Sequence, residues 1–178
     1  MNRTTLRRTA AALALGVAAA TAPAAVGASS ATAAPYCGIY WGPLAKSSSV
    51  STAPTVTGLR AGRHTCYDRL VIDHKGRASG FSVRYVPEIT ADGSGNVIPT
   101  AGGAKLQIIT HATRYTTPPA MPNVSGFSTF RQVVYAGSFE GQTTIGLGVR
   151  ARLPFRVFTL NDTATGTSRL VIDVAHQW

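Results

Sequence analysis

Two aspartates are the first residues to consider for chemistry, because they occupy matching places in a repeated pentapeptide. Arg69-Leu70-Val71-Ile72-Asp73 recurs as Arg169-Leu170-Val171-Ile172-Asp173. Carboxylates brought close together could act as a general acid and a general base. The alternative is that each is a strand-end acid paired with an arginine or a backbone N–H. The sequence contains no nucleophile elbow, no His-Glu-x-x-His and no phosphate-binding glycine loop, and its histidines share no motif. We therefore expect no catalytic residue.

Cys37 and Cys66 are the only cysteines, and an even count in an exported chain indicates a disulfide. In the chain-entropy estimate, this bond would stabilise the fold by roughly 3 to 4 kcal/mol. The alternative is a metal site completed by His64 and His74, but the spacing of these residues matches no standard zinc pattern. We expect a disulfide, no metal and no cofactor.

One run of alternating residues offers a candidate binding surface. From Ile145 to Val157 the odd positions are apolar, while the even positions begin with glycines and then become basic. Because side chains alternate across a strand, the apolar set should face the core and the other set should face solvent. The glycines either relieve a bend or bulge, or let a flat ligand approach the backbone. Arginine forks suit carboxylates and phosphates. The candidate ligand-binding residues on this face are Gly146, Gly148, Arg150, Arg152 and Arg156. The alternative is a bend with a solvated arginine edge.

Aromatic residues gather beside Cys37, at Tyr36, Tyr40 and Trp41. Exposed aromatic rings often contact sugars, because the face of the ring attracts the C–H face of a pyranose. The alternative is that the rings plug an open end of the fold. Tyr40 and Trp41 complete the candidate ligand-binding set.

Strand signals recur along most of the chain, and no window of twelve residues shows convincing helical spacing. Runs rich in Val, Ile, Thr, Tyr and Phe predict strands at 69–73, 80–87, 104–111, 130–138, 143–151, 155–160 and 168–174. Residues 42–63, rich in Ser, Thr, Pro and Gly, predict a loop. The repeated pentapeptide fits two similar strands of a pseudo-symmetric sandwich, with chance similarity as the alternative. The predicted fold class is all-β, a single β-sandwich or barrel-like domain preceded by a cleavable signal peptide.

The first 33 residues predict that signal peptide. Arg3, Arg7 and Arg8 precede an apolar run too short to span a bilayer, and Ala-Thr-Ala at 31–33 suits signal peptidase. Sec export fits better than the twin-arginine route. The expected organisation is a signal peptide at 1–33, an N-terminal segment and loop closed by the disulfide at 34–66, and the sandwich at 67–178. No later run of 18 apolar residues occurs, so we expect no transmembrane segment after cleavage.

The charge that remains after cleavage narrows the partners. Fourteen basic and seven acidic residues give a net charge of +7. Outside a cell this charge favours anionic partners such as wall polymers, acidic sugars or lipid headgroups, although it could also serve solubility alone. The basic residues are scattered and form no aromatic–basic motif, so we expect no nucleic-acid partner.

Several segments together resemble the AMIN-like domain of bacterial secreted and envelope proteins. They are YCGIYWG at 36–42, YDRLVID at 67–73, GFSVRYV at 80–86, GSFEGQTTIGLGV at 137–149 and SRLVIDV at 168–174. Related AMIN domains accompany N-acetylmuramoyl-alanine amidases and secretins, and are β-sandwiches that direct those proteins to peptidoglycan. The resemblance implies a non-catalytic module that binds the cell envelope.

We therefore expect a protein that is secreted or held in the cell envelope and is not an enzyme. Its expected partner is cell-wall glycan (peptidoglycan) or an anionic wall polymer, and another envelope protein is a further candidate. The alternative is a secreted enzyme or enzyme inhibitor with an unrecognised site.

Processing of the N-terminus is directly testable. Mass spectrometry of the exported protein should find an N-terminus between about Ser29 and Pro35, because the small residues at 31–33 precede the expected cut. A mature chain that keeps Met1 contradicts the signal-peptide prediction.

Overall fold

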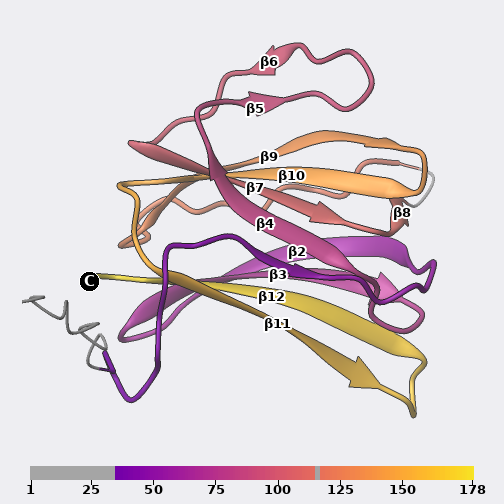
Figure 1. Cartoon of the computed structure of the whole chain (residues 1–178), viewed down its shortest axis with the longest axis horizontal. Helices are drawn as coiled ribbons and strands as arrows, with labels where there is room; N and C mark the ends of the chain where they lie inside the picture. The colour runs from indigo at the N-terminus through magenta and orange to yellow at the C-terminus, as the bar shows by residue number, and fades with distance from the viewer. Residues whose placement is uncertain (1–34, 115–116) are drawn as a thin grey trace, which may run out of the picture. The chain divides into compact units, whose positions relative to one another are not determined.

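The computed structural model describes residues 35–114 and 117–178, in which all regular secondary structure is β-strand. Two five-stranded sheets pack against each other (Figure 1). The first has the order β1 (Lys46–Ser48), β4 (Phe81–Val86), β7 (Ala104–Thr110), β10 (Gln142–Val149), β9 (Phe130–Phe139). The second has the order β11 (Phe155–Asp162), β12 (Thr167–Ala175), β3 (Tyr67–Lys75), β2 (Thr55–Arg63), β8 (Thr113–Arg114). A separate hairpin pairs β5 (Ile89–Thr90) with β6 (Val97–Ile98). The predicted all-β class is confirmed, and the signal peptide expected at 1–33 lies outside the described residues.

The core lies between the two sheets and follows from the alternation of side chains. The odd positions of the run after Thr144 point into it, as expected: Ile145, Leu147, Val149 and Phe155 are fully buried. Each large side chain taken from water contributes roughly 1.5–3 kcal/mol. The facing residues of the second sheet are Leu70, Ile72, Leu170, Ile172 and Val174.

The loop predicted at 42–63 is wrong at residues 46–48, which form β1, and over its second half. Residues 55–63 form β2, which pairs with β3 along almost its whole length. The strand contains Gly58 and Gly62 and is only half-buried, so its composition resembles a loop although its backbone is paired with β3, and with β8 at its first two residues. β2 is therefore part of the sandwich and not of a loop that precedes it.

The run from Thr144 to Arg156 is not one strand. β10 ends at Val149 in the first sheet, and β11 begins at Phe155 in the second. Tyr85 fixes the crossover, because its hydroxyl donates to the Leu153 carbonyl at 2.6 Å and accepts from the Leu153 N–H at 3.0 Å. Burial raises the pKa of Tyr85 to about 12, which keeps this hydroxyl protonated. The even positions before and after the crossover therefore lie on different sheets.

Gly146 and Gly148 face away from the core, but they do not face solvent. Both are buried. A Cβ on Gly146 would lie 2.7 Å from side-chain carbons of both Ile89 and Val134, and one on Gly148 would collide with the Ala101 carbonyl oxygen. The expectation of an open glycine surface is wrong, because the segment that carries β5 and β6 packs on this part of β10. Because glycine has no Cβ, that segment can lie this close to the backbone of β10.

Two buried polar side chains link the sheets. Asp68 on β3 accepts the N–H groups of Thr129 at 2.5 Å and Phe130 at 3.3 Å, at the start of β9. His74 on β3 lies 3.1 Å from the Thr110 hydroxyl on β7. Burial lowers the pKa of His74 to about 4, so its imidazole is neutral near pH 7. A buried polar group without such partners would be unfavourable.

The disulfide predicted between Cys37 and Cys66 is confirmed, with Cα atoms 6.4 Å apart. It ties the segment before β1 to the turn between β2 and β3. Among the described residues, no helix is long and apolar enough to cross a membrane.

Substitution of Gly146 tests the covered face of β10. Gly146→Ala should lower the free energy of unfolding by about 1–3 kcal/mol, because the new methyl group would overpack against two side chains. Gly58→Ala is the matched control, since its Cβ would make only ordinary contact, and it should change stability by less than about 0.5 kcal/mol. Urea unfolding measures both, and equal effects would contradict a tightly covered Gly146.

Candidate binding surface

The two repeated pentapeptides lie on neighbouring strands. β3 and β12 run antiparallel, with Val71 opposite Val171. Arg69 therefore lies opposite Asp173, and Arg169 lies opposite Asp73. The Leu and Ile residues of both repeats point into the core, so the Arg, Val and Asp residues share the outer face of the second sheet. A local two-fold axis between the two valines relates the repeats.

Asp173 organises one end of this face. Its carboxylate is fully buried and accepts two hydrogen bonds from Arg69, at 2.6 and 2.9 Å, and one from the Nε of Arg156 on β11, at 2.7 Å. The hydrogen bonds that Arg69 donates to Asp173 raise the pKa of Arg69 above its ordinary value. The pairing interpretation of this aspartate is confirmed, with an arginine on each side of it.

Aromatic rings enclose the Arg156 guanidinium. Its central carbon lies 5.4 Å from the ring centres of Trp41 and Tyr67 and 5.2 Å from that of Phe158. Such cation–π contacts favour a fixed guanidinium. The indole N–H of Trp41 donates to the Tyr36 carbonyl at 2.9 Å, within the segment that the disulfide ties down. Trp41 thus covers the outer face of the second sheet and not an open end of the sandwich.

The opposite end of the face is built differently. Asp73 pairs with Arg60 on β2, which contributes bonds of 2.7 and 2.8 Å. Gly58 on β2 lies opposite Asp73, just as Arg156 on β11 lies opposite Asp173. Because glycine has no side chain, this position cannot supply a second arginine to Asp73. Arg169, the cross-strand neighbour of Asp73, is exposed and makes no hydrogen bond or ion pair with any residue that the structure describes. We call Arg60, Arg69, Arg156 and Arg169 together the arginine face.

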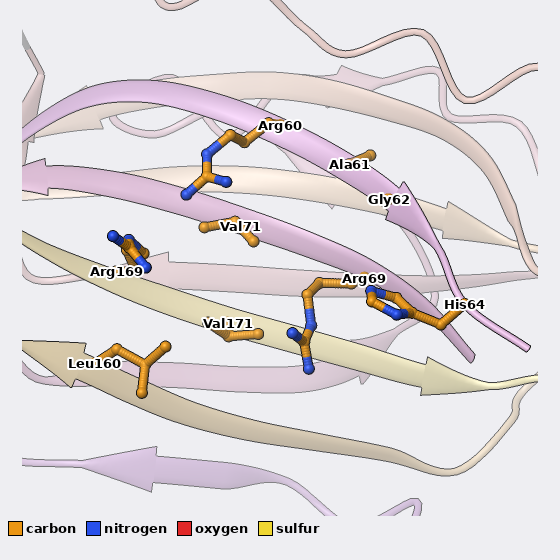
Figure 2. Close-up of a pocket in the computed structure, with 9 residues that line it drawn as sticks. All are labelled: Arg60, Ala61, Gly62, His64, Arg69, Val71, Leu160, Arg169 and Val171. Atoms are coloured by element: carbon orange, nitrogen blue, oxygen red, sulfur yellow. The ribbon is translucent and has the colours of Figure 1, made fainter. Parts of the chain in front are cut away.

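A shallow hollow of roughly 310 Å³ opens on the arginine face. Val71 and Val171 lie between its arginines (Figure 2). A second hollow, of roughly 390 Å³, adjoins it over the β11–β12 hairpin and shares Leu160 and Arg169. The first hollow is lined by Arg60, Ala61, Gly62, His64, Arg69, Val71, Leu160, Arg169 and Val171.

The candidate binding residues predicted from the sequence do not all lie on one surface. Arg156 and Trp41 lie on the arginine face, and Tyr40, 75% exposed, is next to Trp41 in the chain. Arg150 and Arg152 lie in the crossover before β11, where Arg150 donates to the His176 carbonyl and Arg152 covers the Tyr85 ring.

Sequence reasoning missed Arg60, Arg69 and Arg169 as candidate binding residues. The alternation Arg-x-Val-x-Asp in both repeats was the signal that places two of them on one face. Within residues 35–114 and 117–178, no group of three or more His, Cys, Asp or Glu side chains could hold a metal ion.

The two aspartates should differ in their effect on stability. Asp173→Asn should lower the free energy of unfolding by about 2–3 kcal/mol, because it removes the charge from a buried acceptor that serves two guanidiniums. Asp73→Asn, at a solvent-exposed pair, should lower it by less than about 1 kcal/mol. Urea unfolding with unchanged m-values would measure both, and a larger effect at Asp73 would contradict this assignment.

Of the comparisons with known proteins, the one with protein families gives a match. Neither the curated proteins nor the solved structures contain a match to the chain. The family model of the AMIN-like domain matches residues 54–176, from the residue before β2 to the residue after β12. The matched region includes all four residues of the arginine face. AMIN-like domains are associated with bacterial envelope proteins and are generally non-catalytic modules. The match spans well over half of the sequence, and the chain belongs to the AMIN-like domain family.

Proposed function

We propose that the protein is a secreted, non-catalytic module of the cell envelope that binds peptidoglycan or another anionic wall component through the arginine face. The observation that carries the proposal is the excess of positive charge on one outer sheet face. Four arginines share it with only two carboxylates, Asp73 and Asp173. Wall peptides and anionic wall polymers present the carboxylates and phosphates that guanidinium groups bind best.

Three of the four arginines of this face are held in position before any ligand arrives. Asp173 fixes Arg69 and Arg156, and Asp73 fixes Arg60. Ordering a long side chain on binding costs about 0.5–1.5 kcal/mol, so guanidiniums that are already ordered give more affinity per contact. Both carboxylates act as acceptors for arginine, which supports binding rather than acid–base catalysis and disfavours the enzyme alternative.

The apolar part of the surface suits a sugar or a polymer backbone. Leu160 is 45% exposed at the edge of both hollows, while Val71 and Val171 are buried at the floor of the first hollow. Tyr67, Trp41 and Phe158 add aromatic surface around Arg156. Apolar lining with a few well-placed polar groups is the usual composition of ligand sites.

Localisation outside the cytoplasm agrees with two features of the chain. Its N-terminal segment predicts export. The disulfide that holds Trp41 near the arginine face belongs to an oxidising compartment.

The test is sedimentation of the full chain with purified peptidoglycan sacculi, with and without their anionic polymers. Arg60→Ala combined with Arg169→Ala should weaken binding about a hundredfold, because two charge-assisted contacts of about 1.5 kcal/mol each are lost. Both side chains are exposed, so the variant should remain folded, which circular dichroism checks.

Arg150→Ala combined with Arg152→Ala is the matched control, since it removes the same charge elsewhere. Binding that is retained in this control supports the arginine face. Loss in the control together with retention in the Arg60 and Arg169 variant would instead place the site at the crossover, as the sequence alone suggested, and would overturn the proposal.

A further inference from the structure

We infer that the arginine face binds a linear polyanion at two points, one at each end of the β3–β12 pair, and not a single charged group. The anionic groups of such a polymer are carboxylates or phosphodiesters. This inference rests on the proposed function and specifies the ligand of the same surface.

The two-fold relation between the repeats separates the charges. Arg69 and Arg169 lie at opposite ends of the paired pentapeptides, four residues apart along the strands. Four residues of antiparallel strand span about 14 Å. Val71 and Val171, both uncharged and buried, lie between them. A single carboxylate or phosphate cannot reach across this distance, whereas two groups on one chain can.

Counting only the arginines and aspartates on the outer face of the sheet, each end carries one positive charge more than its carboxylate balances. Asp173 serves Arg69 and Arg156 at one end, and Asp73 lies between Arg60 and Arg169 at the other. A separation of about 14 Å exceeds the Debye length of about 8 Å at physiological ionic strength. The two ends therefore attract anions nearly independently, and each has its own anion to bind.

Both ends also retain N–H donors that the protein does not use. Asp173 takes only the Nε of Arg156, so the two terminal nitrogens of that guanidinium donate to no described residue. The same holds for one terminal nitrogen of Arg60 and for all of Arg169 within the described part of the chain. Unpaired N–H donors on guanidiniums that are at least partly exposed are suited to bidentate capture of an oxyanion.

Asp162 in the β11–β12 hairpin is the acidic group that opposes binding at the Arg169 end. Its pKa is lowered, chiefly by the hydrogen bonds from Thr165, with a smaller contribution from the charge of Arg169. The two side chains form no direct ion pair, and both line the second hollow. Asp162→Asn replaces the carboxylate with a neutral amide. The amide oxygen can still accept from the N–H groups of Ala164 and Thr165, but the competing negative charge is removed.

The experiment measures affinity against ligand length. The full chain is titrated calorimetrically with oligogalacturonides, which carry carboxylates, and with glycerol-phosphate oligomers, which carry phosphodiesters, each from the monomer upward. Affinity should rise by at least about tenfold once the oligomer is long enough to span both ends, because the second contact becomes intramolecular. The arm with the larger rise identifies the anionic group.

Variants test whether the rise of affinity with oligomer length comes from the two ends of the arginine face. Arg169→Ala should bring the long oligomers to within about twofold of the short ones, while Asp162→Asn should strengthen long-oligomer binding about two- to threefold. Arg152→Ala should leave the rise in place. A smooth dependence without a rise, or a rise that survives Arg169→Ala, overturns the two-point inference. If sacculi still bind through the arginine face in that case, the proposed function stands, and if sacculi do not bind, both fail.

Discussion

The register between β3 and β12 is the constraint on which both the core and the candidate surface depend. With Val71 opposite Val171, the Leu and Ile residues of two identical pentapeptides point inward, and two arginine–aspartate pairs face each other across the strands. A shift of one residue would move every one of these side chains to the other face of the sheet. The charged face is thus set by the same hydrophobic pattern that sets the core, and it needs no separate determinant.

The register also places Asp173 opposite Arg69, at a fully buried position. A fully buried carboxylate is unfavourable unless it is paired and hydrogen-bonded. Arg69 and Arg156 satisfy it from opposite sides, and the rings of Trp41, Tyr67 and Phe158 pack around Arg156. The disulfide contributes by tying down the segment that supplies Trp41. The result is a rigid end of the face, while Asp73 and Arg60 form a more exposed pair at the other end.

The sequence predicted local features of the fold, such as strands and inward-facing positions, but not the contacts between segments that are distant in the chain. Alternation and composition predicted the seven longer strands after β2 and the inward face after Thr144, because these depend on neighbouring residues alone, whereas the short strands β5, β6 and β8 were not predicted. β2 was missed because its glycines and half-exposed pattern resemble a loop, and only pairing with β3 makes it a strand. Similarly, the group that lies close to the backbone at Gly146 and Gly148 is not the flat ligand that the sequence suggested. The approaching group is a distant segment of the same chain, which no local pattern identifies.

These contacts give the outer faces of the two sheets different roles. Ile89 of β5 packs against β10 and β9 of the first sheet, with Val134 and Ala136, and closes that region to a ligand. On the outer face of β11, β12, β3 and β2, exposed arginines, two carboxylates and the two hollows lie together instead. Apolar packing there is confined to the floor between the charges and to the rings around Arg156. Because the core side chains lie on the opposite side of the same strands, the exposed arginines can change without altering the core. A sandwich of this kind can therefore keep its fold while the residues at positions 60 and 169 change.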